Sequence, residues 1–214
     1  MNRKIKQFFI FILIYLVFLS SLYAETIGQR NALKSAKAYL NFMSFSYSGL
    51  IDQLEYEGFT ISEATYGVDN CGADWNEQAE FSAKSYLEFT SFSRQGLIEQ
   101  LEYEGFTEAQ AIYGVNQVYI DSSEQVVDKA KSYLRYAAFS YLGLVEQLEY
   151  EGFSTSDATY GANHCGADWN EQAILSAKSY LDCYSFSQKE LIEQLEYEGF
   201  THDQALYGVA NAYY

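Results

Sequence analysis

Apolar residues fall into one continuous run near the start of the chain and a periodic pattern along the remainder. The run from Phe8 to Leu19 holds 12 apolar residues without interruption. Further along, apolar side chains recur every three or four positions, which is the spacing of one face of an α-helix. A clear example is the series Trp75, Ala79, Ala83, Tyr86, Leu87. The pattern predicts an all-α body behind a short hydrophobic leader.

The helical pattern occurs four times at a fixed distance. The string Leu-Glu-Tyr-Glu-Gly-Phe starts at residues 54, 101, 148 and 195, so that successive copies lie 47 residues apart. A period of about 20–50 residues is typical of repeat proteins. We therefore divide the chain into a leader and four helical repeats, with the boundaries 1–24, 25–72, 73–119, 120–166 and 167–214.

Each repeat carries the signals of three helices. Asp74 with Glu77 is typical of the beginning of a first, longer helix, and Ser46 is a plausible N-cap of a second one. Gly58 supplies the left-handed residue that ends this second helix, and Thr60 then begins a third. The result is a helix–turn–helix preceded by a longer helix. Because 47 residues form only a small core, we expect the repeats to dock on one another.

The repeats also differ in a way that suggests pairs. Repeats 1 and 3 share Cys-Gly-Ala-Asp-Trp-Asn-Glu-Gln-Ala, at 71–79 and 165–173, whereas repeat 2 has a different sequence at 118–126. The chain therefore resembles a duplicated module of two repeats. We expect four three-helix repeats docked as two tandem pairs. The Trp-bearing helix would join the repeats inside each pair, and the weaker stretch Ser122-Ser123 would join the two pairs.

The leader has the plan of a secretory signal peptide. Three basic residues precede the apolar run, and a short polar segment leads to Ala24 and Glu25. The run is short for a spanning helix of about 20 residues, so we expect cleavage after Ala24. An uncleaved membrane anchor is the alternative, because Leu22 is larger than the residue preferred there. No cysteine follows the run, so a lipobox is missing. In both cases the repeats would be extracellular, at the cell surface.

Charge narrows the classes of partner. The net charge is −16, and without the three bases of the leader 10 basic and 29 acidic residues leave −19. Such a body repels nucleic-acid phosphates and attracts a basic partner, although solubility alone also explains the charge. The third helices contain no Lys or Arg. We therefore expect no nucleic-acid binding by the helix–turn–helix, whose DNA-binding form needs positive charge there.

Nothing in the sequence favours catalysis or a bound cofactor. The histidines, His164 and His202, stand at unlike positions of different repeats, and no Cys/His spacing is typical of a metal site. Acidic residues lie on amphipathic helices and fit solvated faces. We expect no enzyme activity, cofactor or metal. The disulfide state stays open because three cysteines cannot all pair within one chain; they are Cys71, Cys165 and Cys183.

Seventeen positions are identical in all four repeats, and most have a packing or backbone explanation. Lys37 is the only base among them, and a Lys–Glu bridge between helices is its simplest role. Gln53 and the three residues after Leu54 are harder to explain, since some of them must face water. They serve either a structural role or a repeated contact with a partner. For the second role we define the contact strip as Glu55, Tyr56, Glu57, Glu102, Tyr103, Glu104, Glu149, Tyr150, Glu151, Glu196, Tyr197 and Glu198.

Several motifs resemble the Ltp family of host cell surface-exposed lipoproteins, found in Gram-positive bacteria and their temperate phages. They are Ala-Lys-Ser-Tyr-Leu, Phe-Ser-x-x-Gly-Leu-Ile-Glu-Gln-Leu-Glu-Tyr-Glu-Gly-Phe and Gly-Ala-Asp-Trp-Asn-Glu-Gln-Ala, and the resemblance covers about 30–214. It implies small helix–turn–helix repeats. It also implies prophage-encoded superinfection exclusion, in which DNA injection by a second phage is blocked through the incoming tape measure protein.

The chain departs from the best-known member of this family in two respects. It lacks the lipobox cysteine, and it has four repeats where two are expected. The resemblance favours a surface-exposed binding protein that captures a basic or amphipathic segment of a phage protein. The alternative is a structural or envelope-associated protein that binds wall material or another surface protein and has no phage role.

Overall fold

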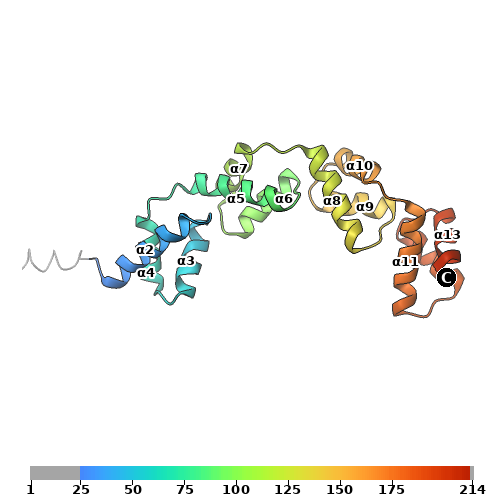
Figure 1. Ribbon diagram of the computed structural model, residues 1–214, viewed down its shortest axis with the longest axis horizontal. Coiled ribbons are helices and arrows are strands. Elements are labelled where there is room, and N and C mark those ends of the chain that lie inside the picture. Colours follow the sequence, from blue (N-terminus) through green and yellow to red (C-terminus); the bar gives the residue numbers. More distant parts are fainter. Residues whose placement is uncertain (1–24, 213–214) are drawn as a thin grey trace, which may run out of the picture. The chain divides into compact units, whose positions relative to one another are not determined.

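The computed structural model describes residues 25–212, and all regular secondary structure in this range is α-helical, as the sequence predicts. The leader, with its predicted cleavage site or anchor, lies outside the described residues. The helices are α2 (Ile27–Leu40), α3 (Tyr47–Tyr56), α4 (Ile61–Asn70), α5 (Trp75–Phe89), α6 (Arg94–Tyr103), α7 (Glu108–Gln117), α8 (Ser122–Tyr136), α9 (Tyr141–Tyr150), α10 (Thr155–His164), α11 (Trp169–Cys183), α12 (Gln188–Tyr197) and α13 (His202–Ala212). Each repeat thus holds one longer and two shorter helices (Figure 1).

The predicted helix ends at Ser46, Gly58 and Thr60 are confirmed. The Ser46 side chain accepts a hydrogen bond from the backbone of Gly49, and Thr60 with Glu63 forms a reciprocal capping box. Gly58 has φ +95°, and the Phe59 amide donates to the Leu54 carbonyl at 3.2 Å. This is the Schellman ending, in which a residue without Cβ adopts the left-handed conformation at no steric cost.

Each repeat has its own small core, built from all three helices. In repeat 2 the fully buried side chains are Leu97 and Leu101 of α6 and small residues of α5 and α7. A Cβ added to Gly114 of α7 would lie 2.5 Å from the backbone of Ala79 in α5. Glycine is therefore required here because the first and third helices of the repeat approach each other closely.

The described residues form two compact units, divided between Asp74 and Trp75, so that repeats 2, 3 and 4 share one unit. Within it the Ser93 hydroxyl donates to the Glu151 carbonyl, and the Ser140 hydroxyl donates to the Glu198 carbonyl, each at 2.5 Å. This grouping differs from the expected two tandem pairs. The bonds at the joint between repeats 2 and 3 match those between repeats 3 and 4, because they use positions that the repeats share. The joint that follows repeat 2, next to the Ser122-Ser123 stretch, thus carries the same bonds as the joint between repeats 3 and 4.

None of the helices in residues 25–212 combines the length and the apolar character that crossing a bilayer requires.

Candidate contact surface

The second glutamate of the contact strip is held by the first helix of its own repeat. In repeat 3 the Tyr133 hydroxyl of α8 donates to Glu151, and the Gln147 side-chain amide of α9 donates to that hydroxyl at 3.1 Å. Equivalent pairs of bonds occur in the other three repeats, on Tyr39, Tyr86 and Tyr180. Gln53, Glu55, Tyr56 and Glu57 had no evident role in the sequence. The glutamine and the second glutamate therefore have a structural role, because they fix a tyrosine between two helices.

The protonation equilibria of these groups reflect the same contacts. Burial, and then the hydrogen bond to Glu151, raise the pKa of Tyr133 to about 12. Burial alone would raise the pKa of Glu151, but hydrogen bonds from Lys129 and Tyr133 outweigh it and lower that pKa. Both shifts favour a neutral tyrosine that donates to a charged carboxylate, which is the stronger type of hydrogen bond.

The lysine that is identical in all four repeats was expected to form a bridge to a glutamate of another helix. This prediction is wrong in repeats 2 and 3, where the contacts of the lysine are seen. Lys84 contacts Glu80 at 2.5 Å and Lys131 contacts Asp128 at 3.5 Å, each within its own helix. An interhelical bridge is made instead by Lys129, whose ammonium group lies 2.9 Å from Glu151. Lys129 stands two residues before the invariant position, where other repeats have serine. In repeats 2 and 4 these serines donate to the equivalent glutamates at 3.1 and 3.0 Å.

The tyrosine of the contact strip faces away from the core. Its side chain is 89% exposed in repeat 1, and the other copies, Tyr103, Tyr150 and Tyr197, are 86–88% exposed. Among the described residues, none of the four makes a hydrogen bond or ring contact. The direction follows from helical geometry, because a residue two positions after the buried Leu54 lies on the opposite side of the helix. We define the tyrosine row as Tyr56, Tyr103, Tyr150 and Tyr197.

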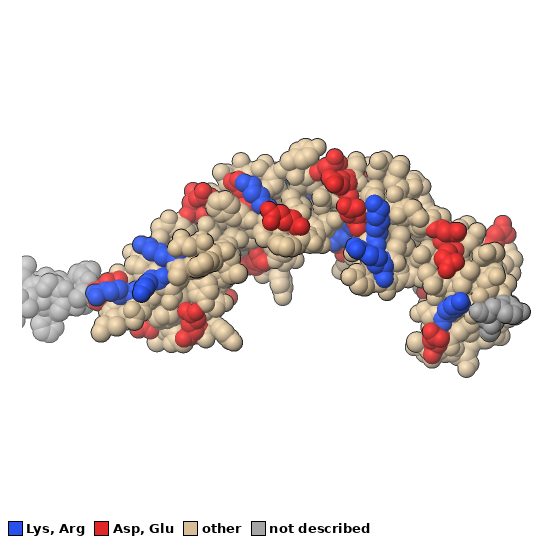
Figure 2. All heavy atoms as spheres, viewed as in Figure 1, with Lys and Arg blue, Asp and Glu red and all other residues tan. Residues whose placement is uncertain are grey.

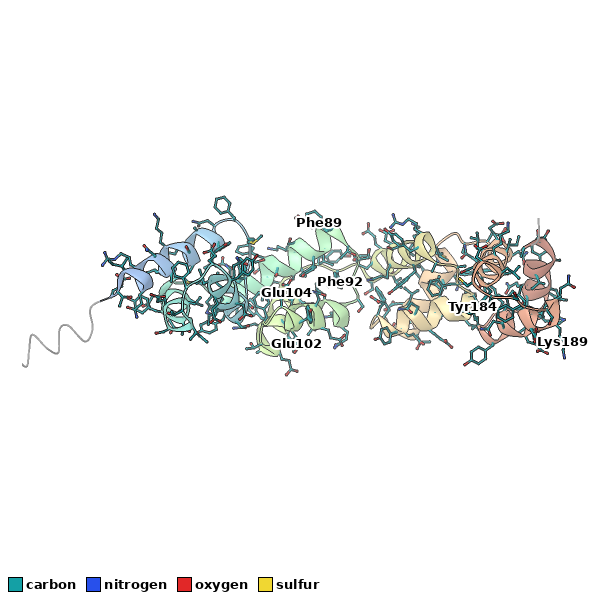
Figure 3. All side chains as sticks on the ribbon, turned by 90° about the horizontal axis from the view of Figure 1, so that it is seen from below. Phe89, Phe92, Glu102, Glu104, Tyr184 and Lys189 are labelled. Carbon is teal, nitrogen blue, oxygen red and sulfur yellow. The ribbon has the colours of Figure 1, made fainter. Side chains whose placement is uncertain are left out.

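The first glutamate of the strip is less constrained than the second. Glu55 and Glu102 are exposed, and Glu149 is half-buried. Glu196 lies 2.6 Å from the His202 ring nitrogen. Figure 3 shows the difference in repeat 2, where Glu104 lies over the helices and Glu102 lies at the edge of the unit. The strip therefore combines outward tyrosines and carboxylates with an inner carboxylate that orders the helix end.

A second set of exposed aromatics was missed by the sequence analysis. Phe42, Phe89 and Tyr136 follow one another at 47-residue intervals at the end of the first helix, and they are 85–89% exposed. Figure 3 shows Phe89 projecting away from the ribbon, in contrast to Phe92 between repeats 2 and 3. The signal was present in the sequence as aromatic residues at one position of three repeats. Repeat 4 has Cys183 there and the exposed Tyr184 next to it.

A groove of about 950 Å³ adjoins this second set within the unit formed by repeats 2 to 4. It lies between the end of α5, one side of α8 and the turn before α11, and its lining includes Phe89, Lys131, Arg135 and Tyr136. On the face drawn in Figure 2, charged side chains form small separate groups with wide uncharged areas between them. No cluster of histidine, cysteine or acidic residues in the described part of the chain is arranged to hold a metal ion.

These features define an α-helical repeat protein. In each repeat a tyrosine–glutamate hydrogen bond joins two helices, and a second tyrosine points outward. The sequence profile of the host cell surface-exposed lipoproteins, Ltp, matches residues 28–71, 74–118, 121–165 and 168–211, and the chain belongs to this family. The solved structure of Ltp, a superinfection exclusion protein from the Streptococcus thermophilus temperate phage TP-J34, is 32% identical in sequence. That match covers 44% of this chain and 98% of the other, with a TM-score of 0.41. Among curated proteins, none matches the chain.

Proposed function

We propose that this protein is displayed at the cell surface and excludes superinfecting phages by blocking the injection of their DNA. Membership of the family of host cell surface-exposed lipoproteins supports the location, and the family resemblance supports the activity. The partner is a basic or amphipathic segment of an incoming phage protein, for which the tape measure protein is the candidate. The contact is made by the tyrosine row together with the first glutamate of the contact strip in each repeat, namely Glu55, Glu102, Glu149 and Glu196.

The identity and the exposure of the four tyrosines support this surface as the binding site. The four tyrosines of the row are identical and 86–89% exposed, although exposed positions close by differ between repeats. Packing does not require an aromatic ring at a position that is almost fully exposed. Tyrosine is favoured in protein interfaces because it offers a large, rigid and amphipathic side chain at low entropic cost.

Repetition also explains how weak contacts suffice. Four similar sites on one chain raise the effective concentration of each further contact once a first contact has formed. The acidic body, with 29 acidic residues, adds electrostatic attraction for a basic segment and speeds association at low salt. Each tyrosine site therefore needs only modest affinity.

The experiment replaces all four tyrosines of the row with alanine in the full chain, expressed in a susceptible host. We expect phage adsorption to stay unchanged while DNA injection recovers toward the level of cells without the protein. Because the side chains are exposed, their loss should leave helicity and melting unchanged. The matched control replaces four other exposed aromatics, Phe42, Phe89, Tyr136 and Tyr184, and should retain exclusion.

Two results would contradict the proposal. If the wild-type protein leaves DNA injection unaffected for every phage that infects the host, the exclusion function is wrong and the envelope role becomes the better one. If the wild type excludes phage and the tyrosine variant excludes equally well, the function stands but the surface is wrong.

A further inference from the structure

Docking between successive repeats uses a serine hydroxyl at the start of the second helix. Ser93 and Ser140 are 4% and 2% exposed, because the end of the following repeat covers them. Each donates to a backbone carbonyl there, on Glu151 and Glu198 respectively. A second bond runs beside it, from the Phe139 amide to Gln172 at 3.2 Å, with its equivalent at the preceding joint.

The third residue of the same helix must be small for this docking to occur. A Cβ added to Gly96 would lie 3.0 Å from the Glu151 carbonyl oxygen, and one added to Gly143 would lie 3.4 Å from that of Glu198. A longer side chain pointing in this direction would occupy the place of the incoming carbonyl. Glycine at this position therefore leaves room for the next repeat.

Repeat 4 has Glu190 at this position. Its carboxylate accepts hydrogen bonds from the Ser187 hydroxyl at 2.7 Å and from the Ser187 amide at 3.0 Å. The hydroxyl that would bind a following repeat is thus used within its own helix, and Ser187 is exposed. The neighbouring Lys189, which Figure 3 shows on the outer side of the last repeat, has an 84% exposed side chain.

We infer that Glu190 closes the docking face of repeat 4 and keeps a second copy of the chain from joining there head to tail. A carboxylate in the position of the incoming carbonyl would place two hydrogen-bond acceptors against each other. At the opposite end, the residues that the structure describes form no such closure. Space is open around Gly58 of repeat 1, whereas the equivalent Gly152 and Gly199 contact the preceding repeat. A face that binds a different face of the next copy produces open chains of molecules, which this glutamate prevents.

The first test moves the closing residue to an internal joint. The Gly143→Glu variant of the full chain should separate repeat 4 from repeat 3, although glutamate favours the local helix more than glycine does. The reporter is hydrogen exchange of the Phe139 amide, which is bonded to Gln172 across the joint. We expect its exchange to accelerate at least tenfold, while the Phe92 amide at the preceding joint keeps its rate.

The control for this test is Gly143→Ala, whose Cβ would lie 3.4 Å from the Glu198 carbonyl oxygen and 3.1 Å from the Ser140 hydroxyl, so that a small shift accommodates it and the protection of Phe139 should be retained. Unchanged exchange of the Phe139 amide in Gly143→Glu, with helicity retained, would overturn the inference. A variant that loses helicity throughout would also count against it, because the closing capping box should form within the helix.

The second test opens the face of repeat 4. The Glu190→Gly variant should show a sedimentation mass that rises with concentration, and adding Ser187→Ala should reverse the rise. Glu190→Gln keeps the length and the capping geometry without the charge, and it should stay monomeric like the wild type. A linked repeat sees its neighbour at an effective concentration in the range of about 1 mM. A Glu190→Gly chain that is still monomeric at that concentration contradicts the inference.

Discussion

Removing one hydroxyl from repeat 3 tests whether the tyrosine–glutamate pairs hold the repeats together. In Tyr133→Phe the ring and its edge-on contact with Phe139, at 5.7 Å between centroids, are kept. The bond to Glu151 is lost, and the Gln147 amide loses its acceptor. A hydrogen bond to a charged group contributes about 1.5–3 kcal/mol to stability. Because Tyr133 is only half-buried, water replaces part of it, and we expect a loss of about 1–2 kcal/mol.

A double-mutant cycle assigns this loss to the pair. Urea unfolding followed by circular dichroism would be measured for Tyr133→Phe, Glu151→Gln and the double variant. Residues in direct contact typically show a coupling energy of about 0.5–3 kcal/mol, so the double variant should lose less than the two single losses together. The wild-type bridge from Lys129 to Glu151 is absent in both glutamine variants and cancels. Effects that add within about 0.5 kcal/mol would refute the structural role of this bond.

Three further predictions concern pH, backbone strain and export. The pKa of Tyr133 is raised to about 12 in the folded chain. The stability that this shift contributes is therefore fully present below pH about 10 and is lost as the pH rises toward about 12. Circular dichroism against pH should show that Tyr133→Phe, which lacks this group, loses less stability between about pH 10 and about pH 12 than the wild type does. Gly58→Val should destabilise the chain by about 1 kcal/mol or more, because φ is +95°; unchanged melting would mean that the helix ends elsewhere. Cleavage after Ala24 predicts a mature N-terminus at Glu25 in mass spectra of protein from the native host, and a full-length chain in the membrane fraction would establish the anchor instead.

Features that depend on neighbouring residues could be predicted from the sequence. Capping at Ser46 and Thr60 and the helix end at Gly58 involve atoms within a few residues of one another, so the order of residue types specifies them. The buried leucines follow from the helical period in the same way. The outward direction of Tyr56 was also within reach, since it lies two positions after Leu54 on the same helix.

Contacts between helices could not be assigned in this way. Tyr133 and Glu151 are 18 residues apart, and whether a tyrosine or the invariant lysine reaches the carboxylate depends on side-chain direction and helix crossing. The grouping of repeats was also misjudged from sequence differences at residues 118–126. The bonds at the joints come from shared positions elsewhere, namely the serine hydroxyl of one repeat and a backbone carbonyl of the next.

A binding titration shows whether the tyrosine row binds a phage protein. The purified repeats would be titrated with segments of a phage tape measure protein at two salt concentrations, beside the variant with alanine at Tyr56, Tyr103, Tyr150 and Tyr197. We expect binding by the wild type that weakens at high salt, and a loss of at least tenfold in affinity in the variant. Equal affinity of the two proteins for a segment that the wild type binds would contradict this expectation.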